Sequence, residues 1–303
     1  MALPKHASTL ERVWYYTYLV ICALIFLFLI APILIVIPLS FNAEPYFTFT
    51  QKMLSFDPTG YSTRWYDLLL TFGMTAPDAP RDSSWWSDVW NNAAWVNAAK
   101  NSVIIGFFST ILAAALGTLA ALGLSRPEMP YRRAIMAILI SPMIVPIIIT
   151  ATGLFFFYSK TGLAGTYVGI ILAHATLGIP FVIITVTATL VGFDHSLTRA
   201  SASLGANATT TFRKITMPLI LPGVISGALF AFVTSFDEVV VVLFVAAHDQ
   251  QTIPRQMWNG IREQISPAIL SVATILVIIS VLLLATMELL RRRSERLRGL
   301  SPG

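Results

Sequence analysis

The segment DHSLTRASASLGANATTTFRKITMPLILPG, residues 194–223, separates two apolar runs with a polar stretch far longer than a turn requires. It opens with Asp194, a residue type that caps helix N-termini, and Gly205 is the type that ends helices in a left-handed conformation. Asn207 offers a second cap and Pro218 a second stop. We predict two short helices joined by a sharp bend at Gly205, and this geometry alone fits a binding surface or a merely structural loop.

The runs that flank this segment are two of six apolar runs, each long enough at about 20 residues to cross about 30 Å of hydrocarbon. Hydrophobic residues make up 56% of the 303-residue chain and charged residues only 12%, which argues against a water-soluble enzyme. We therefore predict an all-α integral membrane protein with six transmembrane helices. The runs are 14–39, 101–124, 134–158, 166–191, 222–245 and 267–290.

The first run exceeds the apolar core of about 7 to 15 residues in a signal peptide, so we predict that it is retained. Pro142, Pro146 and Pro180 lie within the later runs and predict kinks. Gly117 and Gly178 are small enough to let membrane helices approach closely. Together these residues predict a compact, kinked bundle.

The distribution of Lys and Arg predicts that both termini are cytoplasmic, because thirteen of the twenty then lie inside. The net charge of +5 is thus a topology signal and indicates no nucleic-acid partner, although the basic tail could alternatively bind nucleic acid or anionic lipid. The predicted parts are a cytoplasmic segment 1–13, the first helix 14–39, a periplasmic loop 40–100 with interfacial helices, a five-helix core 101–290 containing the inner loop 192–222, and a basic cytoplasmic tail 291–303.

The outer loop holds five of the seven tryptophans, of which Trp86 and Trp90 are four apart and share one face of a helix. We predict an amphipathic helix over 85–96 at the membrane interface, with docking of a soluble partner as the alternative. No role is assigned to residues 75–92 of this loop. A second outer helix is predicted over 253–264, with a proline in its first turn.

The inner loop resembles the EAA loop of ABC importer permeases in its pattern RAS, LGA, FRKITMP and LPG, with the glycine and both prolines at matching spacing. In that family the loop forms coupling helices that dock into the ATPase subunit. The resemblance assigns ATPase coupling to Arg199, Ala200, Ser201, Leu204, Gly205, Ala206 and Phe212. Arg199 departs from the family pattern, which has an acidic residue there, so the assignment is strongest for Gly205.

Further stretches resemble the spermidine/putrescine-type permeases, above all SFDEVV at 235–240 and HAT with IPFV at 174–182. The resemblance implies a type I ABC importer permease fold, polyamine transport and a multi-pass location in the bacterial inner membrane. It also implies as partners a homologous second permease, two ATPase subunits and a periplasmic binding protein. Another cationic or amine-bearing solute is the alternative substrate.

The chain contains no G-x-x-x-x-G-K-[ST] phosphate-binding pattern. We therefore expect a transporter subunit rather than an enzyme, with ATP and Mg used by the partner ATPase and no cofactor or metal bound by this chain. The one cysteine, Cys22, excludes an internal disulfide and a cysteine-based metal site.

Three polar residues within the apolar runs, Asp237, Glu238 and His174, are candidates for the substrate pathway, because ionisable groups in the bilayer are costly. A carboxylate at 237 would offer negative charge to a cation; the alternative is a buried, hydrogen-bonded carboxylate or an ion pair with a partner subunit. For His174 the alternative is a hydrogen bond between helices. A membrane-embedded enzyme using all three is a competing hypothesis without a recognisable catalytic motif, and an ion-coupled carrier would predict internal repeats, which we do not find.

Overall fold

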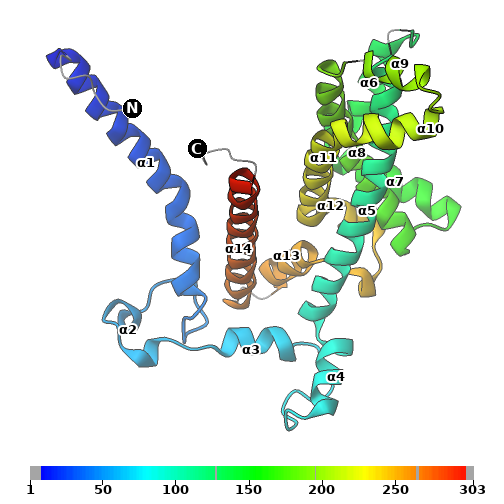
Figure 1. The fold of residues 1–303 in the computed structure, drawn as a ribbon. Coiled ribbons are helices and arrows are strands. Elements are labelled where there is room, and N and C mark those ends of the chain that lie inside the picture. The colour runs from blue at the N-terminus through cyan, green and yellow to red at the C-terminus, as the bar shows by residue number, and fades with distance from the viewer. Residues whose placement is uncertain (1–7, 127, 195, 264–265, 298–303) are drawn as a thin grey trace. The chain divides into compact units, whose positions relative to one another are not determined.

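The computed structural model describes residues 8–126, 128–194, 196–263 and 266–297, and the regular elements within them are helices (Figure 1). Within the described residues, four helices are each long and apolar enough to cross a membrane, and a bent pair makes five if it forms one span. The protein is thus an all-α, multi-pass membrane protein. The count of six spans and the cytoplasmic termini stay predictions.

The chain forms two units, which are described separately. The first comprises residues 1–72 and 260–303, and the second comprises residues 73–259. The helix α13 (Ile253–Glu263) crosses the boundary between the two.

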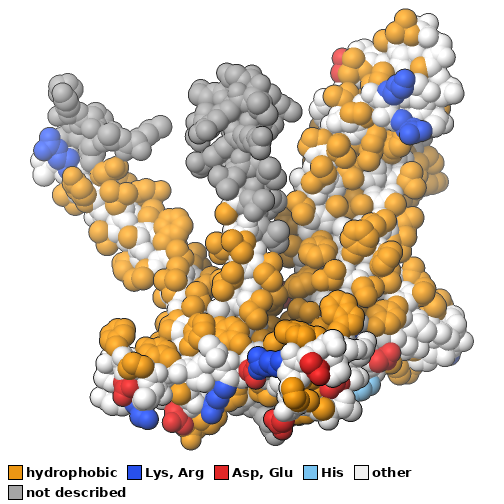
Figure 2. Space-filling model, turned by 60° about the horizontal axis from the view of Figure 1, so that its bottom comes forward, with side chains coloured by type: hydrophobic (Ala, Val, Ile, Leu, Met, Phe, Trp, Pro, Cys, Tyr) orange, Lys and Arg blue, Asp and Glu red, His pale blue; other side chains and the backbone are white. Residues whose placement is uncertain are grey.

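The first unit begins with α1 (Thr9–Leu39), which starts earlier than the apolar run because Ser8 caps it. The Ser8 hydroxyl accepts the Glu11 N–H at 3.3 Å, and the Glu11 carboxylate accepts the Ser8 N–H at 2.7 Å. This reciprocal pair satisfies two backbone donors that a helix start leaves free. Hydrophobic side chains cover α1 along its length (Figure 2), and none of its most apolar window is buried.

Beyond α1 the first unit continues through α2 (Gln51–Leu54), η1 (Pro58–Gly60) and α3 (Arg64–Thr71). The helix α14 (Ala268–Leu297) contacts both α1 and α3. It continues through residue 291, where we expected a separate tail, while residues 1–7 and 298–303 lie outside the described part of the chain.

The second unit holds α4 (Ser83–Asn92), α5 (Ala94–Leu124), α6 (Arg132–Ile140), η2 (Ser141–Met143), α7 (Ile147–Thr161), α8 (Tyr167–Val191), α9 (Ser196–Ser203), α10 (Ala208–Thr211), η3 (Phe212–Thr216), α11 (Met217–Asp237), α12 (Val240–Val245) and η4 (His248–Gln250). Three long helices, α5, α8 and α11, pack side by side. Within this unit, α4 lies at one end of α5, and α9 and α10 lie at the other (Figure 1).

Small residues bring these three helices together. A Cβ on Gly178 would lie 2.9 Å from the Ala231 Cβ and 3.2 Å from the Ala113 Cβ. A Cβ on Gly117 would lie 2.6 Å from the Cβ of Val182, closer than side chains tolerate. The predicted close approach at Gly117 and Gly178 is confirmed, and it suits membrane helices, which gain their stability from tight packing.

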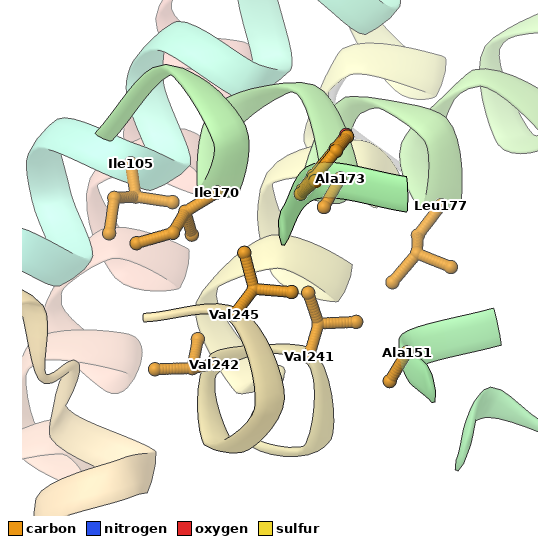
Figure 3. Close-up of a cluster of buried hydrophobic side chains, with 9 residues drawn as sticks. Ile105, Ala151, Ile170, Ala173, Leu177, Val241, Val242 and Val245 are labelled. Atoms are coloured by element: carbon orange, nitrogen blue, oxygen red, sulfur yellow. The ribbon is translucent and has the colours of Figure 1, made fainter. Parts of the chain in front are cut away.

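A second cluster joins α12 to α5, α7 and α8. Val241, Val242 and Val245 are buried, and Figure 3 shows them facing Ile170 and its neighbours on α8. The short helix α12 is therefore anchored by one apolar face, although only six residues long.

Two of the predicted spans are not single helices. The run 134–158 is divided into α6 and α7, which are bent by 94° at a break that holds Pro146. The run 222–245 is interrupted after Asp237, where α11 ends, and two residues separate it from α12, which begins at Val240. Proline explains the first break, since it removes a helical hydrogen bond and clashes with the preceding turn, while the second has no proline.

Candidate functional site

The first half of the inner loop forms α9, with the predicted start and stop. The Asp194 carboxylate accepts the Ser196 N–H at 2.8 Å and the Ser196 hydroxyl at 2.7 Å. Gly205 has φ of +81°, and the N–H groups of Gly205 and Ala206 donate to the carbonyls of Ala202 and Ser201 at 3.0 and 3.1 Å. This pair of hydrogen bonds is the Schellman arrangement, which favours glycine at the left-handed position.

The second half restarts at Asn207, whose side chain accepts the Thr210 N–H at 2.8 Å. The expected stop near Pro218 is wrong. A π-helical turn, η3, follows α10, with the Met217 N–H donating to the Phe212 carbonyl, and α11 starts directly after it. Pro218 lies in the first turn of α11, where its missing N–H leaves the chain free to continue.

The two halves of the loop are joined by a hydrogen bond of 2.8 Å between the hydroxyls of Ser201 and Thr211. Ser201 is buried, whereas Arg199 and Ala200 are exposed. Leu204 is 88% exposed at the tip, beside the open Gly205, and Ala206 and Phe212 are half-buried. The loop thus presents an apolar tip on a fixed two-helix support.

One continuous helix connects this loop to the polar residues of the fifth run. It spans Ala208 to Asp237, 30 residues that include the π turn, or about 45 Å at 1.5 Å per residue. The inner loop and Asp237 therefore lie at opposite ends of a single helical rod.

At the far end of this rod the two carboxylates have different surroundings. Asp237 is exposed in the isolated chain, whereas Glu238 is 7% exposed. The Glu238 Oε1 accepts the Val241 N–H at 2.7 Å, which places a carboxylate at the N-terminus of α12, where the helix dipole favours it. Glu238 thus has the surroundings of the buried, hydrogen-bonded alternative, and Asp237 is the carboxylate left open to a ligand.

The opposite end of α12 is held by Arg255 of α13. Its Nη1 donates to the Val242 carbonyl at 2.8 Å, a carbonyl that also accepts the Ala246 N–H at 3.2 Å. A cation at a helix C-terminus completes the pattern begun by Glu238. Arg255 was missed by sequence reasoning, because nothing in the outer helix distinguishes an inward-facing arginine from a solvated one.

His174 lies in the three-helix packing rather than on an open surface, being 1% exposed. Its Nδ1 is 2.8 Å from the Ser235 hydroxyl of α11, which accepts a hydrogen bond from the Ser109 hydroxyl of α5 at 2.9 Å. This chain of three side chains joins α5, α8 and α11, and matches the alternative of a hydrogen bond between helices. The two serines were not predicted, since serine within an apolar run has no distinguishing neighbour.

Comparisons with known proteins identify the family of this chain. Residues 113–296 match the family model described as binding-protein-dependent transport system inner membrane component. The spermidine/putrescine transport system permease protein PotC of Haemophilus influenzae is 30% identical over 271 residues, covering 89% of this chain and 95% of the relative. The putrescine transport system permease protein PotI of Escherichia coli is 30% identical over 265 residues, covering 85% and 84%.

Two solved structures share the fold. A bacterial ABC transporter involved in the import of the acidic polysaccharide alginate superposes with a TM-score of 0.66 at 17% identity, over 94% of this chain and 98% of that one. The MetNI methionine ABC transporter, in an inward-facing conformation, gives a TM-score of 0.50 at 20% identity, over 63% and 91%. This chain therefore belongs to the family of inner membrane components of binding-protein-dependent transport systems.

Proposed function

We propose that this chain is the transmembrane permease subunit of an ATP-driven importer of polyamines in a bacterial inner membrane. Two observations support the substrate class: relatives at 30% identity over most of the chain are spermidine/putrescine and putrescine permeases, and Asp237 is an open carboxylate. Another cationic or amine-bearing solute would meet the same carboxylate and is the second candidate.

The observation that carries the mechanism is the continuous helix from Ala208 to Asp237. The inner loop is the contact for the ATPase subunits, which bind ATP and Mg, while this chain binds no nucleotide. Their closure moves the two-helix loop, and the rod transmits that movement to the break between α11 and α12. Asp237 contacts the cation in the passage, and Glu238, Arg255 and His174 keep the neighbouring helices in position.

The complete transporter contains a homologous second permease, two ATPase subunits and a periplasmic binding protein that delivers the substrate. In this arrangement the chain crosses the membrane six times, with the bent pair α6 and α7 as one span and both termini in the cytoplasm. A membrane-embedded enzyme fits less well, because the His174 ring is buried against Ser235.

The coupling role is tested with Gly205→Val and Gly205→Asn in the assembled transporter. Nothing lies within 4 Å of a Cβ at this position, so a new side chain affects the bend only through its backbone preference. A left-handed conformation costs an ordinary residue about 1–2 kcal/mol, whereas asparagine adopts it readily. We expect Gly205→Val to lose most spermidine uptake and substrate-stimulated ATP hydrolysis, and Gly205→Asn to retain both. Equal activity of the two variants, with equal assembly, would contradict the role of the bend.

The passage role is tested with Asp237→Asn, which removes the charge and keeps the size. We expect spermidine uptake to fall about tenfold or more, the equivalent of about 1.4 kcal/mol of lost attraction for a cation, with the ATPase subunits still bound. The matched control is Asp249→Asn in η4. Unchanged uptake by Asp237→Asn at normal assembly would exclude Asp237 from the passage.

A further inference from the structure

The outer segment from Thr75 to Asn92 is a folded unit whose construction the transport mechanism does not use. The Asp88 carboxylate accepts the Thr75 N–H at 3.1 Å, the Thr75 hydroxyl at 2.7 Å and the Ala76 N–H at 3.0 Å. It also accepts the Asn92 side-chain amide at 2.6 Å. One carboxylate therefore fastens the preceding loop onto α4.

One face of α4 is buried by this arrangement. Trp85 is 1% exposed, with its Nε1 donating to the Pro77 carbonyl at 3.3 Å, and Val89 is 5% exposed. The Asp82 carboxylate caps the helix by accepting the Ser84 and Trp85 N–H groups at 2.9 and 3.0 Å. The orientation of α4 is thus fixed on the side that faces the protein.

The other face of α4 presents two indole rings. Trp86 is 54% exposed and Trp90 is 61% exposed, and their spacing of four residues puts them on one stripe of the helix. Their exposure does not come from a loose loop, because Trp85 beside them is fully packed. The stripe is bordered by Ser83, Ser87 and Asn91, which are exposed and uncharged.

A contact between Lys100 of α5 and Trp90 places this stripe near the start of α5. The Lys100 ammonium lies 4.7 Å from the Trp90 ring centroid and donates to the Trp90 carbonyl. The exposed apolar side chains of α5 begin at Val103 and continue through Phe107 and Phe108. Lys100 precedes Val103 by three residues, or about 4.5 Å of helix, so the residue that contacts Trp90 lies less than one turn from the edge of the apolar surface of α5.

We propose that α4 lies in the lipid headgroup layer, with Trp86 and Trp90 as its anchors. Tryptophan is enriched at this level because its ring is apolar and its N–H is a hydrogen-bond donor. The Lys100 ammonium lies over the Trp90 ring, and the donors that the Trp90 carbonyl leaves free can bind lipid phosphates. The exposed serines and Asn91 suit the same hydrated layer, and the stripe continues the lipid-facing surface of α5.

The anchor fixes the start of α5, because α4 and α5 are separated only by Ala93. The segment 75–92 is therefore a support that holds the outer end of this span at one depth. This inference is independent of the transported solute, since it concerns lipid contact alone.

The test measures tryptophan fluorescence of the full chain in vesicles of phosphatidylcholine and phosphatidylglycerol. One set of vesicles contains phosphatidylcholine brominated near the glycerol backbone, and the other contains phosphatidylcholine brominated near the chain ends. The variants are Trp86→Phe with Trp90→Phe, and the matched control is Trp85→Phe in the same helix. Trp95→Phe is a second control in α5, where the indole is 9% exposed, in case Trp85→Phe fails to insert.

We expect the double variant to lose a large part of the fluorescence that shallow bromine quenches, and the controls to lose none of it. Chain-end bromine should quench the two indoles less than shallow bromine does. The proposal is overturned if the double variant and the controls lose the same shallow quenching. It is also overturned if aqueous iodide, and no brominated lipid, quenches the two indoles, which would favour a docking surface for a soluble protein.

Discussion

The two ends of the second unit contrast sharply in how they are held. The outer segment around α4 is tied by one carboxylate that accepts four hydrogen bonds and by a fully buried tryptophan. At the other end, a hydrogen bond between the Ser201 and Thr211 hydroxyls joins the two halves of the inner loop, and Leu204 is exposed at the tip. The outer segment thus buries Trp85, whereas the inner loop leaves an apolar side chain exposed at its tip.

The largest effect in this comparison is expected at the outer end. Asp88→Ala removes every acceptor that holds the Thr75 and Ala76 N–H groups, so these amides should exchange with solvent at least several-fold faster. Asp88→Asn is the matched control, since its side-chain carbonyl can keep part of the network. Hydrogen exchange of the purified chain in detergent measures the difference. Equal protection in Asp88→Ala and the unaltered chain would contradict the statement that Asp88 holds the outer segment together.

Acid should reproduce this loss in the unaltered chain. Hydrogen bonds from the Asn92 amide, the Thr75 hydroxyl and the Ala76 N–H hold the pKa of Asp88 below its usual range. A carboxyl whose folded pKa is lowered stabilises the fold above its unfolded pKa of about 4, and this stabilisation is lost as the pH falls through the folded value. Protection of the Thr75 amide should therefore decline below about pH 4, and the decline should be absent in Asp88→Ala.

A smaller effect is expected at the inner loop. Ser201→Ala removes the hydrogen bond between the Ser201 and Thr211 hydroxyls, and a neutral hydrogen bond contributes about 1 kcal/mol. Exchange at the α10 amides should rise modestly, and the bound ATPase subunits should suppress the rise. Ser203→Ala is the control, because that hydroxyl donates only to the Arg199 carbonyl of its own helix. A change in Ser201→Ala as large as that in Asp88→Ala would show that the loop is as firmly built as the outer segment.

The sequence predicted the features of this fold that depend on local chemistry. Asp194, Asn207 and Gly205 begin and end helices where their side chains or backbone conformation require it. The outer helix α13 was likewise predicted, since a proline in its first turn marks the start. Hydropathy also located the runs 14–39, 101–124 and 166–191, each of which matches one long apolar helix.

Breaks within the apolar runs could not be predicted in the same way. Val239 is as apolar as its neighbours, so nothing in a hydropathy window separates α11 from α12, and the break depends on Glu238 and Arg255 meeting both ends of α12. Pro142 and Pro146 predicted a kink, but the 94° bend requires tertiary contacts that the sequence does not reveal. Pro218 suggested an end, although proline at a first turn is equally a beginning.

The π turn at Phe212–Thr216 also affects the direction in which the side chains after it point. Each residue of an α-helix turns the chain by about 100°, so a wider turn changes the direction in which every later side chain points. The direction in which Asp237 points relative to the inner loop therefore depends on this turn, which lies 21 to 25 residues earlier in the chain. A helix that unwound or tightened there would rotate the carboxylate about the rod while the loop stayed in place.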